Sequence, residues 1–225
     1  MYSDGSEYCF GCGFVQRSRT IVWAVQDEGE GLSDVSPRIN LPEDTCTTFG
    51  TGATSYLIKS GVGVQQAMER GLRYSPQYDQ LLFPYYDKEG VLACLQARNF
   101  NQYRSQKAKY HNQGSPADVL PIYQSLCGDS FLKTLVITED ALSAIRIASQ
   151  CDAMPALGTY VPVQKLIALR PLYEFLIVWL DRDKFREAHT IADNYKWLGR
   201  SARVIYSELD PKAYTDEQIT AYLTK

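Results

Sequence analysis

The sequence has no long hydrophobic run. The longest unbroken apolar stretch, Phe175 to Leu180, is six residues and is far too short to span a bilayer. The first seven residues, Met-Tyr-Ser-Asp-Gly-Ser-Glu, contain neither a basic leader nor an apolar segment, so no export signal is expected. We therefore expect a soluble, cytoplasmic protein without a membrane partner.

The sequence also lacks an excess of charge of one sign. Its 23 Lys and Arg residues are nearly balanced by 26 Asp and Glu residues, so the net charge does not indicate a nucleic-acid partner. The chain has six cysteines, of which only Cys9 and Cys12 lie close together. This usage argues against a disulfide framework and predicts free thiols and one half of a metal site.

The composition of the sequence is that of an ordinary globular protein. Of its 225 residues, 45% are hydrophobic and 22% are charged, which excludes a disordered chain, a collagen and a coiled coil. Changes in composition divide the chain into four segments. They are a Cys-containing segment (1–25), a Gly-, Ser- and acid-rich linker (26–40), a middle segment (41–128) and a last segment (129–225).

The middle segment predicts short helices followed by a hairpin. Helical spacing at Ser55–Lys59 and at Val64–Arg70 is followed in each case by a glycine, Gly61 or Gly71. Two apolar runs on either side of Asp87–Gly90 then predict a β-hairpin with a four-residue connection.

A basic stretch follows this hairpin. No acidic residue occurs between Gly90 and Ala117, whereas Arg98, Lys107 and Lys109 fall inside, with aromatic residues among them. Basic residues interleaved with aromatics suit a phosphate backbone and stacked bases. The alternative is a solvated strand edge, which Lys and Arg protect from unwanted pairing. Composition alone does not separate these two interpretations.

The last segment alternates buried strands with helices. The strands are expected at residues 134–137, 175–180 and 202–206, and the helices at 141–149, 185–195 and 216–223. This alternation predicts a parallel sheet with right-handed crossovers. The fold class is therefore α/β, with an α+β N-terminal part followed by a parallel sheet flanked by helices.

Four carboxylates stand after these strands, namely Glu139, Asp181, Asp183 and Asp210. Strand ends of an open parallel sheet lie along one edge, where ligands bind. Carboxylate oxygens suit Mg²⁺, and two such ions can serve an in-line displacement at phosphorus. For any single acid, and clearly for Asp140 or Asp183, helix capping is the alternative. A convergence of all four would cost stability unless a cation or a function offset it.

Several segments resemble DnaG-type and phage T7-like DNA primases, in the order in which that family carries them. Similar to the Toprim domain of these primases are TLVITEDALSAIR (134–146), FLIVWLDRDK (175–184) and LDPKAY (209–214). Similar to their RNA-polymerase subdomain are DQLLFPYYDKEG (79–90), QARNF (96–100) and KAKYHN (107–112). The segment YCFGCG (8–13) is similar to the second half of their zinc ribbon.

The resemblance implies a bacteriophage-type primase that makes short RNA primers on single-stranded DNA from NTPs, in the host cytoplasm if the source is viral. It implies Mg²⁺ or Mn²⁺ as cofactor, Glu139, Asp181 and Asp183 as catalytic metal-site acids, and Asp210 as a further ligand. Substrate and template would contact Arg98, Lys107, Lys109 and Tyr110. No Gly-rich Walker loop occurs, so a separate replicative helicase is the expected partner.

The chain departs from the family at two points. Ser143 stands where many relatives carry a second acid, and the first Cys pair of the ribbon is missing. Because a closed zinc site needs four ligands, we expect Cys9 and Cys12 to hold well under one zinc per monomer. The competing functions are a Toprim-type nuclease, which leaves the basic stretch unexplained, and a non-catalytic nucleic-acid-binding replisome subunit, which would tolerate loss of the acids.

Overall fold

The computed structural model describes residues 7–8, 15–16, 39–87, 89–100, 109–125, 131, 133–158 and 160–225. The chain divides into two compact units, residues 1–36 and residues 37–225. In the first unit β1 (Glu7–Tyr8) pairs antiparallel with β2 (Val15–Gln16). Cys9, Cys12 and Lys107 lie outside the described residues, as does most of the expected linker, so the roles given to them remain predictions.

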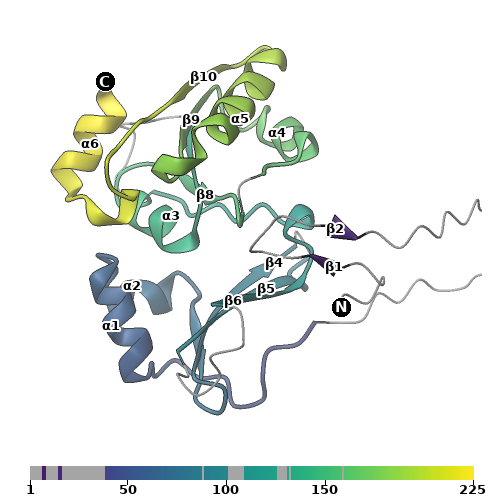
Figure 1. The fold of residues 1–225 in the computed structure, drawn as a ribbon, viewed down its shortest axis with the longest axis vertical. Helices are drawn as coiled ribbons and strands as arrows, with labels where there is room; N and C mark the ends of the chain where they lie inside the picture. The colour runs from purple at the N-terminus through teal and green to yellow at the C-terminus, as the bar shows by residue number, and fades with distance from the viewer. Residues whose placement is uncertain are drawn as a thin grey trace, which may run out of the picture. The chain divides into compact units, whose positions relative to one another are not determined.

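An antiparallel sheet forms the first half of the larger unit, with strand order β3-β4-β5-β6 (Figure 1). The strands are β3 (Arg73–Ser75), β4 (Gln80–Tyr86), β5 (Leu92–Asn99) and β6 (Tyr110–Gly114). The expected hairpin is confirmed, because β4 and β5 are antiparallel neighbours with Leu82 opposite Ala97. Sequence analysis missed β6, whose residues Tyr-His-Asn-Gln-Gly carry no alternation of apolar and polar side chains.

Two helices cover one face of this sheet. They are α1 (Thr51–Lys59) and α2 (Val64–Glu69), and both end near the expected glycines, where Gly61 and Gly71 adopt φ of 66° and 83°. Leu57 of α1 packs in one hydrophobic cluster with residues of β4. The same cluster contains Leu142 and Ile145, from the last segment of the chain. The middle and last segments therefore share a core.

The last segment forms a four-stranded parallel sheet in the order β10-β9-β7-β8 (Figure 1). The strands are β7 (Thr134–Thr138), β8 (Ala153–Pro155), β9 (Phe175–Trp179) and β10 (Ser201–Val204). The predicted parallel sheet is confirmed. Sequence analysis missed β8, since three residues are too few to show a pattern of hydrophobicity.

Helices bury both faces of the parallel sheet. Leu135 and Ile137 of β7 point to the face covered by α4 (Val163–Leu169) and α5 (Phe185–Trp197). Val136, between them, points to the opposite face. That face is covered by α3 (Ala141–Ile147) and α6 (Asp216–Thr224). Burial on both sides explains the continuous apolar runs in the sequence.

The described residues also contain short 3₁₀ helices, namely η2 (Pro116–Asp118), η4 (Arg182–Lys184) and η5 (Pro211–Ala213). None of the helices in the part of the chain that the structure describes is long and apolar enough to cross a membrane.

The strand order reverses between β7 and β9. From β7 the chain runs through α3 to β8 on one side, whereas from β9 it runs through α5 to β10 on the other side. The two connecting helices lie on opposite faces of the sheet. Neighbouring strands whose connections diverge in this way open a crevice at their carboxyl ends, where ligands of open α/β sheets bind.

Candidate active site

Two carboxylates stand at this crevice. Glu139 directly follows β7, and Asp181 follows β9 after one intervening residue. Asp181 is also the residue before η4, but its side chain makes no capping hydrogen bond. Helix capping therefore does not account for Asp181, nor does it account for Glu139, because α3 is capped by the next residue, Asp140.

Both carboxylates have raised pKa values. Burial raises the pKa of Glu139 from its ordinary 4.5 to about 7, with the negative charge of Asp181 as the next cause. Burial likewise raises the pKa of Asp181 from 3.8 to about 6, and the charge of Asp210 adds to it. Oε2 of Glu139 and Oδ1 of Asp181 are buried and accept no hydrogen bond. Such atoms cost stability unless a ligand binds them.

Asp183 differs from these two acids. Its side chain is 73% exposed and forms an ion pair with Lys184 at 2.9 Å. The hydrogen bond from Lys184 lowers the pKa of Asp183 below its ordinary value. Asp183 is near enough for its charge to contribute to the raised pKa of Glu139, but it stands at the solvent side of the site.

A lysine holds two further acids of the site. Lys212 Nζ lies 2.7 Å from Oδ2 of Asp140 and 3.1 Å from Oδ2 of Asp210. Burial opposes the charge on Lys212, but Asp140 and Asp210 together raise its pKa above the ordinary value. The sequence alone gives no sign of this role of Lys212, because its contact with Asp140 spans 72 positions of the chain.

The unpartnered oxygens of Glu139 and Asp181 suit a hard divalent cation, since carboxylate oxygen is the ligand that Mg²⁺ and Mn²⁺ prefer. The charges of Asp183 and Asp210 act on Glu139 or Asp181, so the four acids lie in one region, and their role as metal ligands stays a prediction. Among the residues that the structure describes, no group of three or more His, Cys, Asp or Glu side chains is arranged to hold a metal ion. Two acids therefore face the crevice, and the others pair with lysines.

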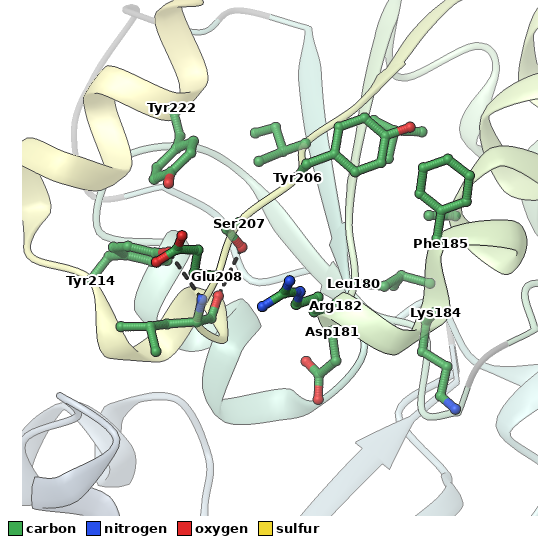
Figure 2. Close-up of a pocket in the computed structure, with 14 residues that line it drawn as sticks. Leu180, Asp181, Arg182, Lys184, Phe185, Tyr206, Ser207, Glu208, Tyr214 and Tyr222 are labelled. Carbon is green, nitrogen blue, oxygen red and sulfur yellow. Dashed lines mark hydrogen bonds between the residues drawn. The ribbon is translucent and has the colours of Figure 1, made fainter.

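A cavity of about 600 Å³ opens beside Asp181 (Figure 2). Phe185 and Tyr206 stand side by side at one side of it, with ring centroids 5.0 Å apart, and each is about half exposed. Arg182 and Lys184 also line the cavity. It thus joins aromatic surface, cationic side chains and one acid of the crevice.

Arg98 lies in a cage of aromatic rings on the antiparallel sheet. Its guanidinium carbon is 3.6 Å from the centroid of the Tyr56 ring and 5.1 Å from that of Tyr110. Nη1 donates to the Tyr110 hydroxyl at 2.9 Å, and the hydroxyls of Tyr56 and Tyr110 are 2.7 Å apart. Nε of Arg98 is buried and has no partner. The cage holds the guanidinium in place while its Nε keeps a donor without a partner.

Strand order separates the two interpretations of the basic stretch at Arg98. β5 lies between β4 and β6, so Arg98 is not on an edge strand and edge protection cannot explain it. Lys109 directly precedes the edge strand β6 and is exposed, so edge protection stays an explanation for Lys109. The charge of Asp140 contributes to the raised pKa of Tyr56, which places the cage close to the acids.

Comparison with known proteins identifies the fold. No family model and no curated protein matches this sequence. The Aquifex aeolicus primase (zinc-binding and RNA polymerase domains) superposes with a TM-score of 0.61 at 13% identity, covering 78% of this chain and 55% of that chain. The primase fragment of the bacteriophage T7 primase-helicase gives 0.58 at 13% identity, covering 98% of this chain and 90% of that chain. The fold is a primase fold.

A third solved structure, a DnaG primase catalytic domain bound to single-stranded DNA, gives a TM-score of 0.60 at 16% identity, covering 77% of this chain and 70% of that chain. At such identities the similarity establishes the architecture alone. The mixed α/β class, with one parallel and one antiparallel sheet, agrees with these domains.

The raised pKa of Glu139 predicts a pH-dependent stability. The unfolded Glu139 ionises near pH 4.5 and the folded one near pH 7, so the folded state loses stability as pH rises between these values. Glu139→Gln should therefore stabilise the metal-free protein at pH 8 by about 1–3 kcal/mol, or a few degrees in Tm. The gain should vanish below pH 4.5.

Thermal unfolding in the presence of a chelator measures this effect. Glu43→Gln, at an exposed position, is the matched control and should leave the pH dependence unchanged. A Glu139→Gln protein that is less stable than the parent at pH 8 would contradict the burial of an uncompensated charge.

Proposed function

We propose that this chain is a DNA primase, which synthesises short RNA primers on a single-stranded DNA template by nucleotidyl transfer. One observation carries the proposal: in a primase fold, Glu139 and Asp181 present buried, unpartnered carboxylate oxygens at the point where the strand order reverses. The Toprim similarity of the sequence around these acids supports the same assignment.

Glu139 and Asp181 would hold the divalent cation, Mg²⁺ or Mn²⁺, with Asp183 on the solvent side. When bound, the cation supplies neutralisation of phosphate charge and lowers the pKa of an oxygen that it contacts. Its positive charge would also offset the repulsion between Glu139 and Asp181. The chemistry of the two acids therefore fits the cofactor.

Glu139 is suited to take the proton from the hydroxyl of the growing primer end. Because a bound cation favours the ionised form of a carboxyl that it contacts, Glu139 would be present as a carboxylate base at the working pH. The carboxylate has two oxygens, so one can bind the cation while the other accepts a hydrogen bond from that hydroxyl. Most of the rate enhancement would come from positioning and from charge neutralisation.

The aromatic cage supplies the template or nucleotide contact. Arg98 would bind a phosphate through Nε, while Tyr56 and Tyr110 hold the guanidinium in place. Lys109, which is exposed beside Tyr110, would add a second phosphate contact. Fixing the cation before the nucleic acid arrives lowers the entropic cost of binding.

A single assay separates the three functions that the sequence allows. Single-stranded DNA, the four NTPs and Mg²⁺ or Mn²⁺ are incubated with the protein, and the products are sized on a gel. We expect new oligoribonucleotides. Shortened DNA would instead indicate a nuclease, and no product would indicate a binding subunit, so either result contradicts the proposal.

Asp181→Asn should reduce primer synthesis by a factor on the order of 100 or more, because it removes a negative charge from the metal site. The fold should remain intact, since Oδ1 of Asp181 makes no hydrogen bond. Asp193→Asn is the matched control, because Asp193 pairs with Lys196 on the exposed surface of α5. Near-normal synthesis by Asp181→Asn would remove this residue from the site.

Arg98→Ala should weaken the binding of single-stranded DNA and reduce its salt dependence, with a change in slope of about 0.7 for one lost phosphate contact. Arg186→Ala, at an exposed position on α5, is the matched control and should leave both quantities unchanged. Fluorescence anisotropy across a series of salt concentrations measures both quantities. An unchanged affinity and slope for Arg98→Ala, with a lower Tm, would make the cage purely structural.

A further inference from the structure

Lys212 occupies a position between two acids that a metal ion would otherwise have to neutralise. Its ammonium contacts Asp140 and Asp210 at once, and its side chain is only 20% exposed. Asp140 comes from the turn after β7, and Asp210 from the segment after β10. One ammonium therefore joins two carboxylates that come from opposite sides of the crevice.

Asp140 has no free capacity for a metal ion. Its Oδ1 accepts hydrogen bonds from the backbone N–H groups of Leu142 and Ser143, at 2.9 and 3.1 Å. Its Oδ2 accepts from the Ser143 hydroxyl at 2.9 Å and from Lys212 at 2.7 Å. Both oxygens are thus engaged by α3 and by Lys212.

The backbone fixes the position of Lys212. The residue lies in η5, directly after Pro211, which is buried. The backbone N–H of Ala213 donates to the carbonyl of Asp210 at 2.9 Å, which closes the turn around Lys212. A cation attached to such a turn is always present, whereas a divalent ion has to be recruited from solution.

The remaining acids form a separate and open half of the site. Glu139 and Asp181 retain buried oxygens without partners, in contrast to Asp140 and Asp210. The crevice thus contains one positive charge that belongs to the chain, on Lys212, and two acids, Glu139 and Asp181, that each have a buried oxygen without a partner.

We propose that the Lys212 ammonium takes the place of one of the two divalent ions, so that the site binds a single divalent cation on Glu139 and Asp181. Asp210 is then a partner of Lys212 and not a metal ligand. The inference rests on the divalent cation of the proposed function.

Counting bound Mn²⁺ tests the inference on the full chain. Electron paramagnetic resonance reports free Mn²⁺ during a titration, without DNA or NTPs, so the result does not depend on priming activity. We expect one Mn²⁺ per parent chain and two per chain for Lys212→Met, because loss of the ammonium frees Asp210 and leaves Asp140 with a negative charge to balance. Lys196→Met, which removes a lysine from a surface ion pair, should stay at one.

Two further variants guard against a folding defect in Lys212→Met. Lys212→Arg keeps the positive charge and should bind one Mn²⁺, and Asp210→Asn should also bind one, because Asp210 is not a ligand. Circular dichroism verifies that each variant is folded. A count other than one in the parent chain, an unchanged count in folded Lys212→Met, or loss of the bound ion in Asp210→Asn would overturn the proposal. Primer synthesis by a parent chain that binds two ions would leave the proposed function standing and reject only the role of Lys212.

Discussion

The burial of negative charge at Glu139 and Asp181 is the constraint on which the rest of the site depends. Both carboxyl groups stand at the ends of neighbouring strands and are partly withdrawn from water, which is the largest cause of their raised pKa values. The charge of Asp181 raises the pKa of Glu139 further, and the charge of Asp210 raises that of Asp181. Such an arrangement destabilises the empty protein. The charges of Lys184 and Lys212 reduce this cost without removing it, and in the proposed function a divalent cation offsets the rest.

The topology of the sheet creates this constraint. Because the connections from β7 and β9 run to opposite faces of the sheet, a crevice opens between their carboxyl ends. The shared core of α1, β4 and α3 then brings the antiparallel sheet close to the crevice. Arg98, held by Tyr56 and Tyr110, therefore lies in the region of Asp140. The acids and the positively charged Arg98 side chain are thus found in the same part of the structure. A phosphodiester backbone and a divalent ion would need this combination.

The parts of the fold that sequence analysis predicted are those with strong hydrophobic patterns. β7 and β9 are buried on both faces and read as continuous apolar runs, and the β4–β5 hairpin has apolar runs around a short connection. The strands that it missed, β3, β6 and β8, are held by pairing with a neighbouring strand and not by their own composition. Local sequence does not report such pairing. The helix α4 was missed as well, since its seven residues are few for a helical pattern.

The candidate site likewise contains residues that could be found from the sequence and contacts that could not. Glu139 and Asp181 could be found because each directly follows a recognisable strand. The contacts of Lys212 with Asp140, and of Tyr56 with Tyr110, join residues 72 and 54 positions apart, so no spacing rule could reveal them. Helix capping by Asp140 was an alternative that the sequence already offered, and the structure confirms it. Only the fold shows that a lysine engages this cap and that Arg98 lies on an interior strand.

A titration of the Glu139 carboxyl by carbon-13 NMR tests most directly whether the crevice is a cation site built on uncompensated negative charge. Without divalent cations the midpoint should lie near pH 7, well above the ordinary 4.5, and it should fall when Asp181 is replaced by Asn. Addition of Mg²⁺ should also move it to lower pH, because the cation favours the ionised carboxylate. A midpoint near 4.5 that neither Mg²⁺ nor the Asp181 substitution changes would contradict this description of the site.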